Sequence, residues 1–475
     1  MSPTGRLTLL ALAAALAAGC AAFDPYNLVS RQPASPGTPS TSPVPPPANA
    51  GLGEAGRRAA LDFVWTTVNE RYYDPKLNGV DWATARARWE PKALAAASDD
   101  EFWDLLDRMT GEMRDAHTRV ESPQRAEQIA RHESITPGFS FAPLEGRLVV
   151  TSVSRDSDAW WAGVRPGMAL AGIGGEPAQA AYAKALAHSR ESSTAYARHR
   201  AALRRLLGGD EGKPLAFAFT RTDGTSLAVT LERKRVASPP RVAKRKLASG
   251  IGYIRLTAWS QNLQGEMVSA IESLKDAPGL VIDLRDNPGG SALMVRNVAA
   301  RLFPKGEKVE YGRTLTRQGK PITIAFDLVE LIKIKQELEG TGTYAGPVAV
   351  LVNAGSGSGS ELFSGLLKTK GRATIVGQTT CGCLLGYMGY AAVPGGGMLA
   401  YSEMGFVFSD GTRIEGEGLA PDVAVALTAA DLAVERDRAL ESAEALLRAK
   451  APQRLTDLRN SGEATAAAMA LPQAR

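Results

Sequence analysis

The chain has 475 residues, with 55 Lys and Arg against 50 Asp and Glu, which is a formal net charge of +5. This length is too great for one simple domain and predicts two or three. Hydrophobic residues make up 44% and charged residues 22%, which excludes a chain that is disordered, collagenous or membrane-spanning throughout. The small positive excess is spread along the chain without basic runs beside aromatic residues, so nothing favours nucleic-acid binding.

The first 20 residues have the pattern of an export signal. Arg6 precedes a Leu- and Ala-rich stretch at 7–18, which is too short to span a bilayer but suits a signal peptide. Its end, Leu-Ala-Ala-Gly-Cys at 16–20, resembles the lipobox of bacterial lipoproteins, whose cysteine is acylated. The resemblance implies lipidation at Cys20 and a periplasm-facing lipoprotein of the cell envelope, with the outer membrane favoured. Ordinary export with cleavage among the alanines is the alternative.

Three changes of pattern divide the next part of the chain. Residues 21–52 are rich in Pro, Ser and Thr and predict an extended tether. Residues 53–130 repeat apolar side chains at helical spacing, which predicts a small helical domain. Residues 131–238 then carry short runs of β-forming residues, which predict a β-domain with a helical insertion at 178–207. Its expected strands are 139–141, 148–153, 169–173, 215–219 and 227–231.

Residues 239–430 alternate apolar strands with helices. Strands are predicted at 251–256, 279–284, 348–352 and 373–376, with helices at 263–274, 292–302 and 361–368. This order predicts a mostly parallel sheet, whose binding sites lie beyond the carboxyl ends of its strands. Residues 431–475 are expected to form a C-terminal helix and a disordered tail.

Two Gly-rich loops follow strand ends in this last domain. One is Asp-Leu-Arg-Asp-Asn-Pro-Gly-Gly at 283–290, and the other is Asn-Ala-Gly-Ser-Gly-Ser-Gly-Ser-Glu at 353–361. A serine in a strand-to-helix turn exposes its hydroxyl, and the helix N-terminus adds backbone amides and a positive dipole end. That suits a nucleophile with an oxyanion hole. A flexible loop or a phosphate-binding nest would show the same alternation of Ser and Gly.

A nucleophilic serine requires a base, and the chain has only four histidines. His188 and His199 lie in the charged insertion and are expected to be solvated, while His132 lies in a polar connection. His117 follows a predicted helix, within Asp-Ala-His-Thr. Because a histidine at a helix end is more often a cap or a surface residue, residue type alone does not select it.

Several motifs occur together in one order. The two Gly-rich motifs, D-L-R-x-N-P-G-G and S-x-S-x-S-E, are preceded by Y-Y-D-P at 72–75 and V-D-W at 80–82, and by a segment at 154–177 that resembles a PDZ core. From about 55 to 430 the chain resembles the tail-specific or C-terminal-processing serine peptidases. The resemblance implies an α/β multidomain fold with a helical N-terminal domain, a PDZ-like β-domain and a crotonase- or ClpP-like α/β catalytic core with a mostly parallel sheet.

The resemblance also implies roles for the residues that match the motifs. The family nucleophile corresponds to Ser358, and the amides of Gly289 and Gly359 correspond to the oxyanion hole. The processing-peptidase branch uses a lysine base where this chain has Cys383, so a Ser-Lys dyad is not available.

A second branch, which resembles the tricorn core protease, uses Ser, His and Glu. Its Asp-x-His-Thr segment matches 115–118 and implies that His117 is the base. Its late Glu-containing segment matches 415–422 and implies that Glu415 orients that base.

PDZ domains bind a peptide as an added strand and hold its terminal carboxylate with loop amides. The resemblance therefore implies peptide binding at Gly138, Phe139, Ser140 and Phe141. A β-domain that only spaces or gates the site is the alternative.

Cys381 and Cys383 form a Cys-x-Cys with three interpretations: buried packing, a redox-sensitive pair, or metal thiolates. Packing is favoured, and metal binding comes last because no further ligands complete a set.

These observations predict an exported serine endopeptidase that cleaves unfolded or C-terminally tagged polypeptides through an acyl-enzyme. No metal or organic cofactor is required. The expected partners are the polypeptide substrate, a C-terminal peptide on the β-domain and the membrane through the lipid anchor. The alternatives are a catalytically inactive peptide- or ligand-binding envelope lipoprotein and an esterase of small acyl substrates.

Overall fold

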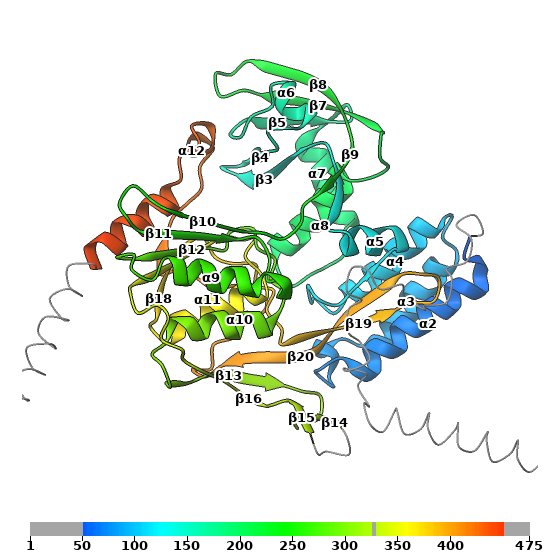
Figure 1. Ribbon diagram of the computed structural model, residues 1–475. Helices are drawn as coiled ribbons and strands as arrows, with labels where there is room; N and C mark the ends of the chain where they lie inside the picture. Colours follow the sequence, from blue (N-terminus) through cyan, green and yellow to red (C-terminus); the bar gives the residue numbers. More distant parts are fainter. Residues whose placement is uncertain (1–50, 325–328, 451–475) are drawn as a thin grey trace, which may run out of the picture.

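The computed structural model of the chain describes residues 51–324 and 329–450 (Figure 1). The predicted signal peptide, Cys20, nearly all of the predicted tether and the predicted C-terminal tail lie outside these residues. Among the described helices, none has the length and apolar character needed to cross a bilayer.

The helical N-terminal region is confirmed, and side-chain caps mark where three of its helices, α3, α4 and α5, begin. Asp81 accepts the Thr84 N–H at 3.0 Å, and Ser98 accepts the Glu101 N–H at 3.1 Å. Leu399 and Tyr401, far along the sequence, complete the hydrophobic core of this region. The elements are α2 (Gly53–Arg71), η1 (Leu77–Gly79), α3 (Trp82–Leu94), α4 (Asp99–Gly111) and α5 (Pro123–Ala130).

The β-domain contains the five strands expected from the sequence. They form a sheet in the order β3-β4-β5-β7-β8, with β6 beside β5, and the strands β2 and β9 pair antiparallel where the chain enters and leaves. The predicted insertion is a pair of helices, α7 and α8. The bounds are β2 (Glu133–Thr136), β3 (Phe139–Leu144), β4 (Arg147–Val153), α6 (Asp158–Trp161), β5 (Ala169–Ile173), β6 (Glu176–Pro177), α7 (Ala178–His188), α8 (Ala195–Leu207), β7 (Pro214–Thr220), β8 (Ser226–Glu232) and β9 (Lys234–Ala237).

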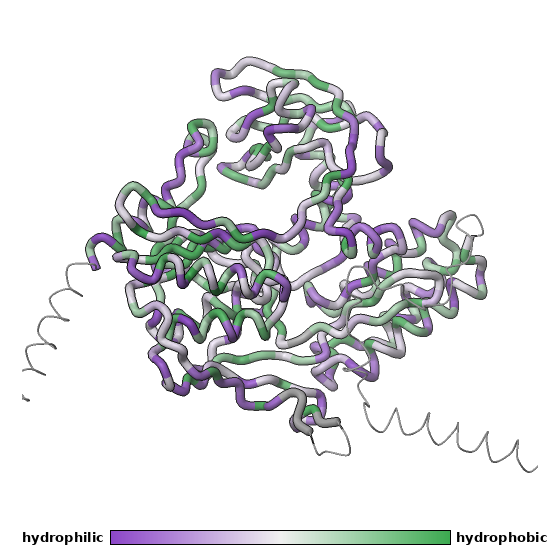
Figure 2. Tube along the Cα trace, in the orientation of Figure 1, coloured by the Kyte–Doolittle hydropathy of each residue, from purple (hydrophilic) through white to green (hydrophobic). Residues whose placement is uncertain are grey.

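The central sheet is mostly parallel, as predicted, in the order β10-β11-β12-β17-β18-β21. Only β10 runs antiparallel to its neighbour, and this edge strand is polar and largely exposed (Figure 2). The strands are β10 (Val242–Lys246), β11 (Gly252–Leu256), β12 (Leu280–Asp283), β17 (Val348–Val352), β18 (Ala373–Gly377) and β21 (Val423–Ala424).

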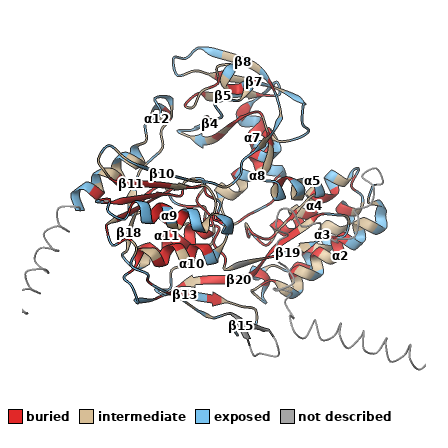
Figure 3. Ribbon diagram, viewed as in Figure 1, coloured by how far each residue is buried: buried red, intermediate tan, exposed pale blue. Residues whose placement is uncertain are grey.

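Both faces of this sheet are buried, which explains the continuous apolar runs of its strands (Figure 3). One face packs against η2 (Gln261–Leu263), α9 (Gln264–Ser273), α10 (Ala292–Ala299), η3 (Ala300–Leu302) and α11 (Gly359–Thr369). The other face packs against residues 438–450, which are helical and follow α12 (Ala429–Ala433).

A second sheet, in the order β1-β20-β13-β16 with β19 beside β20, was not predicted from the sequence. Its longest strand, β20, extends from beside the central sheet and its helices toward the helical region (Figure 1). Because β20 is buried along nearly its whole length, its sequence lacks the alternation of a half-exposed strand. The bounds are β1 (Arg119–Glu121), β13 (Lys308–Leu315), β14 (Ile322–Ile324), β15 (Val329–Ile332), β16 (Lys335–Glu339), β19 (Tyr387–Ala392) and β20 (Met398–Phe408), with β14 and β15 paired to each other.

Candidate active site

Ser358 lies in the turn between strand β17 and helix α11, at the carboxyl end of the strand. Its φ of +49° is uncommon for a residue with a side chain and is typical of a functional turn. The other two serines of the motif are fully buried, and each donates its hydroxyl to a carbonyl: Ser356 to Leu284 at 2.8 Å, and Ser360 to Asn287 at 3.0 Å. The middle residue, half-buried Ser358, differs from them: it is the N-cap of α11 and forms a capping box with Glu361, and among the described residues its hydroxyl donates to no carbonyl.

Glu361 anchors this turn from inside the protein. Its fully buried carboxylate accepts the Ser358 N–H at 2.9 Å and the Thr380 hydroxyl at 2.6 Å. It also accepts the N–H groups of Gly382 at 2.6 Å and Cys383 at 3.0 Å. Burial raises the pKa of Glu361 to about 7, while these four hydrogen bonds act in the opposite direction. The carboxylate thus joins the start of α11 to the loop at 380–383.

Cys381 and Cys383 form a disulfide in this loop, with their Cα atoms 5.2 Å apart. The favoured interpretation, buried packing residues, did not include this bond, although Cys383 is indeed buried. The backbone N–H of Cys381 also donates to the Ser356 carbonyl at 3.0 Å. The described residues contain no group of three or more His, Cys, Asp or Glu side chains placed to hold a metal ion.

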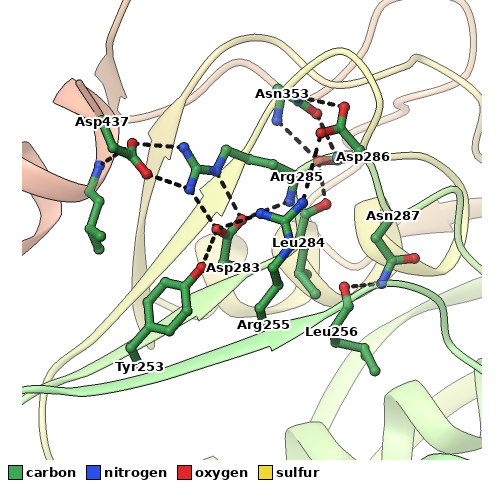
Figure 4. A network of polar contacts seen from close by, with 12 residues as sticks. Tyr253, Arg255, Leu256, Asp283, Leu284, Arg285, Asp286, Asn287, Asn353 and Asp437 are labelled. Atoms are coloured by element: carbon green, nitrogen blue, oxygen red, sulfur yellow. Dashed lines mark hydrogen bonds and ion pairs between the residues drawn. The ribbon is translucent and has the colours of Figure 1, made fainter. Parts of the chain in front are cut away.

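The Asp-Leu-Arg motif ties the end of strand β12 to its surroundings (Figure 4). Fully buried Asp283 accepts hydrogen bonds from Arg285 at 2.6 and 2.9 Å, from Tyr253 at 2.7 Å and from Arg255 at 3.2 Å. Arg285 extends the network to Asp437, with two contacts of 2.8 Å. Because each charge has partners, the motif holds the following loop in one conformation.

Gly289 lies against the start of α11. Its φ is +106°, and a Cβ there would lie 2.6 Å from the Ser358 Cβ and 2.7 Å from the Gly359 nitrogen, so only glycine fits. The Gly289 N–H donates to the Asn287 side chain at 2.9 Å. The two predicted oxyanion-hole residues are therefore adjacent beside Ser358. Gly289 can bind an oxyanion only by sharing or exchanging its bond to Asn287.

His117 lies in a loop after α4 and is held from several sides. Its backbone N–H donates to Asp115 Oδ1 at 2.7 Å. Asp115 Oδ2 accepts hydrogen bonds from the hydroxyls of Thr118 and of Ser402 in β20, each at 2.6 Å. The His117 ring is 3.9 Å from Asp115, and its buried Nδ1 has no hydrogen-bond partner. Burial lowers the pKa of His117 to about 4, so the imidazole is neutral at neutral pH, as a general base requires.

Glu415 lies in a loop that contacts the disulfide loop, since the Gly416 N–H donates to the Gly382 carbonyl at 2.9 Å. Ser193 donates its hydroxyl to Glu415 Oε1, whereas buried Oε2 has no partner. Burial and then the charge of Asp115 raise the pKa of Glu415 to about 9.

The structure brings the loops of the three predicted catalytic residues together through intermediate contacts. No direct hydrogen bond joins any two of Ser358, His117 and Glu415 among the described residues.

Sequence reasoning missed the residues between α7 and α8 that contact this site. The Ser193 hydroxyl accepts the Ala116 N–H at 2.8 Å, and Thr194 donates its hydroxyl to the Cys381 carbonyl at 2.8 Å. Buried Arg190 donates to the Asp115 carbonyl at 2.7 Å. A Ser-Ser-Thr run before a helix predicts only an N-cap, which Thr194 indeed supplies, so the sequence carried no signal for these contacts.

The predicted peptide-binding segment lies at an edge of the β-domain sheet, because β3 is an edge strand. The side chains of Phe139 and Phe141 point into the hydrophobic core, and Ser140 is half-buried. Gly138 adopts a φ of +91°, and a Cβ there would lie 2.4 Å from the Ser157 Cβ. Any peptide contact of this segment would therefore use its backbone.

His199, expected to be solvated, is buried instead. Its Nδ1 lies 2.9 Å from the Tyr182 hydroxyl, and its ring contacts Phe141. The error has a physical cause: α8 is charged overall, but one face of it packs on the β-domain, and His199 lies on that face.

Comparison with known proteins gives this geometry a family context. Residues 250–425 match Peptidase family S41, and residues 54–111 match the Tricorn protease C1 domain. The chain is 29% identical over 344 residues to carboxyl-terminal-processing peptidase 2, chloroplastic, of Arabidopsis thaliana, covering 67% of this chain and 59% of the relative. It is 27% identical over 331 residues to the carboxyl-terminal-processing protease of Synechocystis, covering 67% and 69%.

Two solved structures share the fold. The photosystem II D1 C-terminal processing protease aligns with a TM-score of 0.52 and 22% identity, covering 78% of this chain and 93% of that one. Mature CPAF complexed with lactacystin aligns with a TM-score of 0.62 and 16% identity, covering 86% and 100%. At these identities the likeness concerns the fold alone.

The matched family model and the relatives point to the serine peptidases as the class of protein that this chain is similar to. Residues 250–425 are similar to Peptidase family S41, and two thirds of the chain is similar to carboxyl-terminal-processing serine proteases, which are hydrolases. It spans about three fifths of the length of the Arabidopsis thaliana relative.

Proposed function

We propose that this chain is a serine endopeptidase that cleaves unfolded or C-terminally tagged polypeptides through an acyl-enzyme on Ser358. The observation that carries the proposal is the state of the Ser-Gly motif. Its two outer serines are buried and bonded, while Ser358 has a positive φ at the N-terminus of α11. A hydroxyl in that position meets a substrate carbonyl and adjoins backbone amides that can receive the oxyanion.

In this proposal, the Ser358 oxygen attacks the scissile carbonyl while His117 takes the hydroxyl proton. The Gly359 and Gly289 amides bind the oxyanion of the tetrahedral intermediate. His117 then returns the proton to the leaving amine, and water hydrolyses the acyl-enzyme by the same steps.

His117 and Glu415 support the Ser-His-Glu form of the mechanism. Both Nδ1 of His117 and Oε2 of Glu415 are buried and unpartnered, so a bond between them would satisfy both atoms. The lysine position of the other branch is taken by Cys383, whose backbone supports Glu361 and whose sulfur is in a disulfide.

Substrate class and location belong to the same proposal. The names of the relatives support action near carboxyl termini, and a PDZ-like β-domain would receive such a terminus along β3 at 138–141. The N-terminal 20 residues support an envelope lipoprotein attached to a membrane through Cys20, facing the periplasm.

Degradation of casein by the purified full chain tests this function, with Ser358→Ala and His117→Ala run in parallel. His188→Ala is the matched control, because His188 is exposed on α7. Loss of activity in the first two variants and its retention in the control are expected, together with fluorophosphonate labelling at Ser358. A wild-type chain that binds C-terminal peptides but neither labels nor degrades any substrate would establish the binding-protein alternative instead.

A further inference from the structure

The connection between α7 and α8, residues 189–194, crosses from the β-domain into the candidate active site. Three of its side chains make contacts there, and together they reach three loops. Arg190 donates to the Asp115 carbonyl at 2.7 Å and to the Thr118 carbonyl at 2.5 Å. Thr194 donates to the Cys381 carbonyl at 2.8 Å. The insertion is therefore part of the wall of the site as well as part of the β-domain.

Ser193 has the central place in this connection. Its hydroxyl donates to Glu415 Oε1. The same oxygen accepts the backbone N–H of Ala116, the residue directly before His117, at 2.8 Å. One oxygen thus bridges two segments that lie far apart in sequence. The bridge uses Oε1 and leaves Oε2 of Glu415 without a partner, just as Nδ1 of His117 is without one. The free carboxyl oxygen and the free ring nitrogen therefore belong to the two segments that the Ser193 hydroxyl joins.

We propose that Ser193 is a positioning residue, whose hydroxyl couples Glu415 to the backbone beside His117 so that the Glu415 carboxyl group can orient the imidazole. The inference rests on the proposed peptidase function. It adds that the β-domain insertion supplies a part of the site, so the catalytic domain alone is incomplete. Because His117 must be aligned for proton transfer, a small displacement of Glu415 reduces the rate without affecting substrate contacts.

The test compares Ser193→Ala with Ser192→Ala in the full chain. Ser192 is the matched control, because it is the buried neighbour whose hydroxyl has no hydrogen-bond partner. For Ser193→Ala we expect kcat to fall by about 10- to 100-fold with KM unchanged, as for a misaligned base. Ser193→Thr, which keeps the hydroxyl, restores most of the activity. Because the Ser193 bond favours the ionised carboxylate, Ser193→Ala also moves the pH midpoint assigned to Glu415 upward.

A double-mutant cycle with Glu415→Ala separates positioning from a merely structural role. If Ser193 acts through Glu415, adding Ser193→Ala to Glu415→Ala causes no further loss of kcat. Additive losses, or equal activity in Ser193→Ala and Ser192→Ala, would overturn the inference. If Ser193→Ala folds poorly, Ser193→Thr is compared with Glu415→Ala instead. A Ser193→Thr activity no higher than that of Glu415→Ala would also overturn the inference. Failure of the peptidase proposal looks different, because the wild-type chain itself would then be inactive and unlabelled.

Discussion

The backbone N–H of Cys383 donates to the buried carboxylate of Glu361 at 3.0 Å. The same carboxylate accepts the Ser358 N–H. The position that carries a lysine base in one branch of the resembled family therefore supports, in this chain, the turn that holds Ser358. One cysteine of the disulfide therefore stands at the position of that branch's lysine base. In this chain the residue has a structural contact with Glu361 instead.

Reduction of the disulfide should lower activity. Opening it frees the 381–383 loop, which supplies two of the four hydrogen bonds to Glu361 and so helps to shape the Ser358 turn. We expect a decrease of roughly 10-fold in casein degradation after treatment with dithiothreitol. Mass spectrometry with thiol alkylation would verify the reduction. A Cys381→Ser/Cys383→Ser chain should be insensitive to the reagent, and equal inhibition of that chain would refute the explanation.

Removing the Glu361 carboxylate should destabilise the protein and inactivate it. Glu361→Ala leaves three backbone N–H groups and one hydroxyl without an acceptor in a buried place. Urea unfolding should show a loss of about 3 kcal/mol in the free energy of unfolding. Exposed Glu417 offers the control, since Glu417→Ala should leave stability nearly unchanged. Similar unfolding midpoints for both variants would contradict the anchoring role.

Substitution of Gly289 should abolish activity through a steric clash. In Gly289→Ala the new methyl would lie 2.6 Å from the Ser358 Cβ and 2.7 Å from the Gly359 nitrogen, which forces Ser358 or the Gly359 amide to move. A loss of roughly 100-fold or more in kcat is expected. Gly306 also has a positive φ, of +80°, but has no atom within 4 Å of its Cβ position, so Gly306→Ala imposes backbone strain without a clash. Activity in Gly306→Ala should be kept.

The titration of His117 should appear in both stability and rate. Its folded-state pKa of about 4 lies below the ordinary 6.5, so between these values the native chain binds fewer protons than the unfolded chain. The contribution to the free energy of unfolding is therefore complete above about pH 6.5 and is lost as the pH falls toward 4. The acid limb of kcat/KM should lie well below 6.5. Relative to wild type, His117→Gln should show a weaker rise of stability over this range, and parallel pH profiles would show the assignment to be wrong.

Cys20 should carry the lipid. Cells that express the full chain and incorporate a clickable fatty acid should show a labelled protein in the membrane fraction, whereas Cys20→Ala should be unlabelled. The Cys381→Ser/Cys383→Ser chain keeps Cys20 and should label normally. Labelling that persists in Cys20→Ala would place the modification elsewhere, and an unlabelled wild-type chain would favour ordinary export.

Sequence alone determined the features that depend on neighbours along the chain. Apolar runs predicted the strands of the central sheet, because a strand buried on both faces is apolar along its whole length. Helical periodicity predicted the helices, because a helix buried on one face repeats its apolar residues at helical spacing. The Ser-Gly motif likewise predicted a strand-to-helix turn at Ser358. The resemblance to the family directed attention to His117 and Glu415, which residue type by itself did not.

Only the tertiary structure decided what lies across from these residues. The bond from Ser193 to Glu415, the pairing of β1 with β20 and the four donors around Glu361 join segments that are distant in sequence. No local pattern encodes such contacts, because the same residue types, Ser and Thr, supply the hydroxyl that caps a helix and the hydroxyl that bridges two loops. The disulfide was missed for a related reason: a Cys-x-Cys is chemically ambiguous until the fold sets the distance and direction of its side chains.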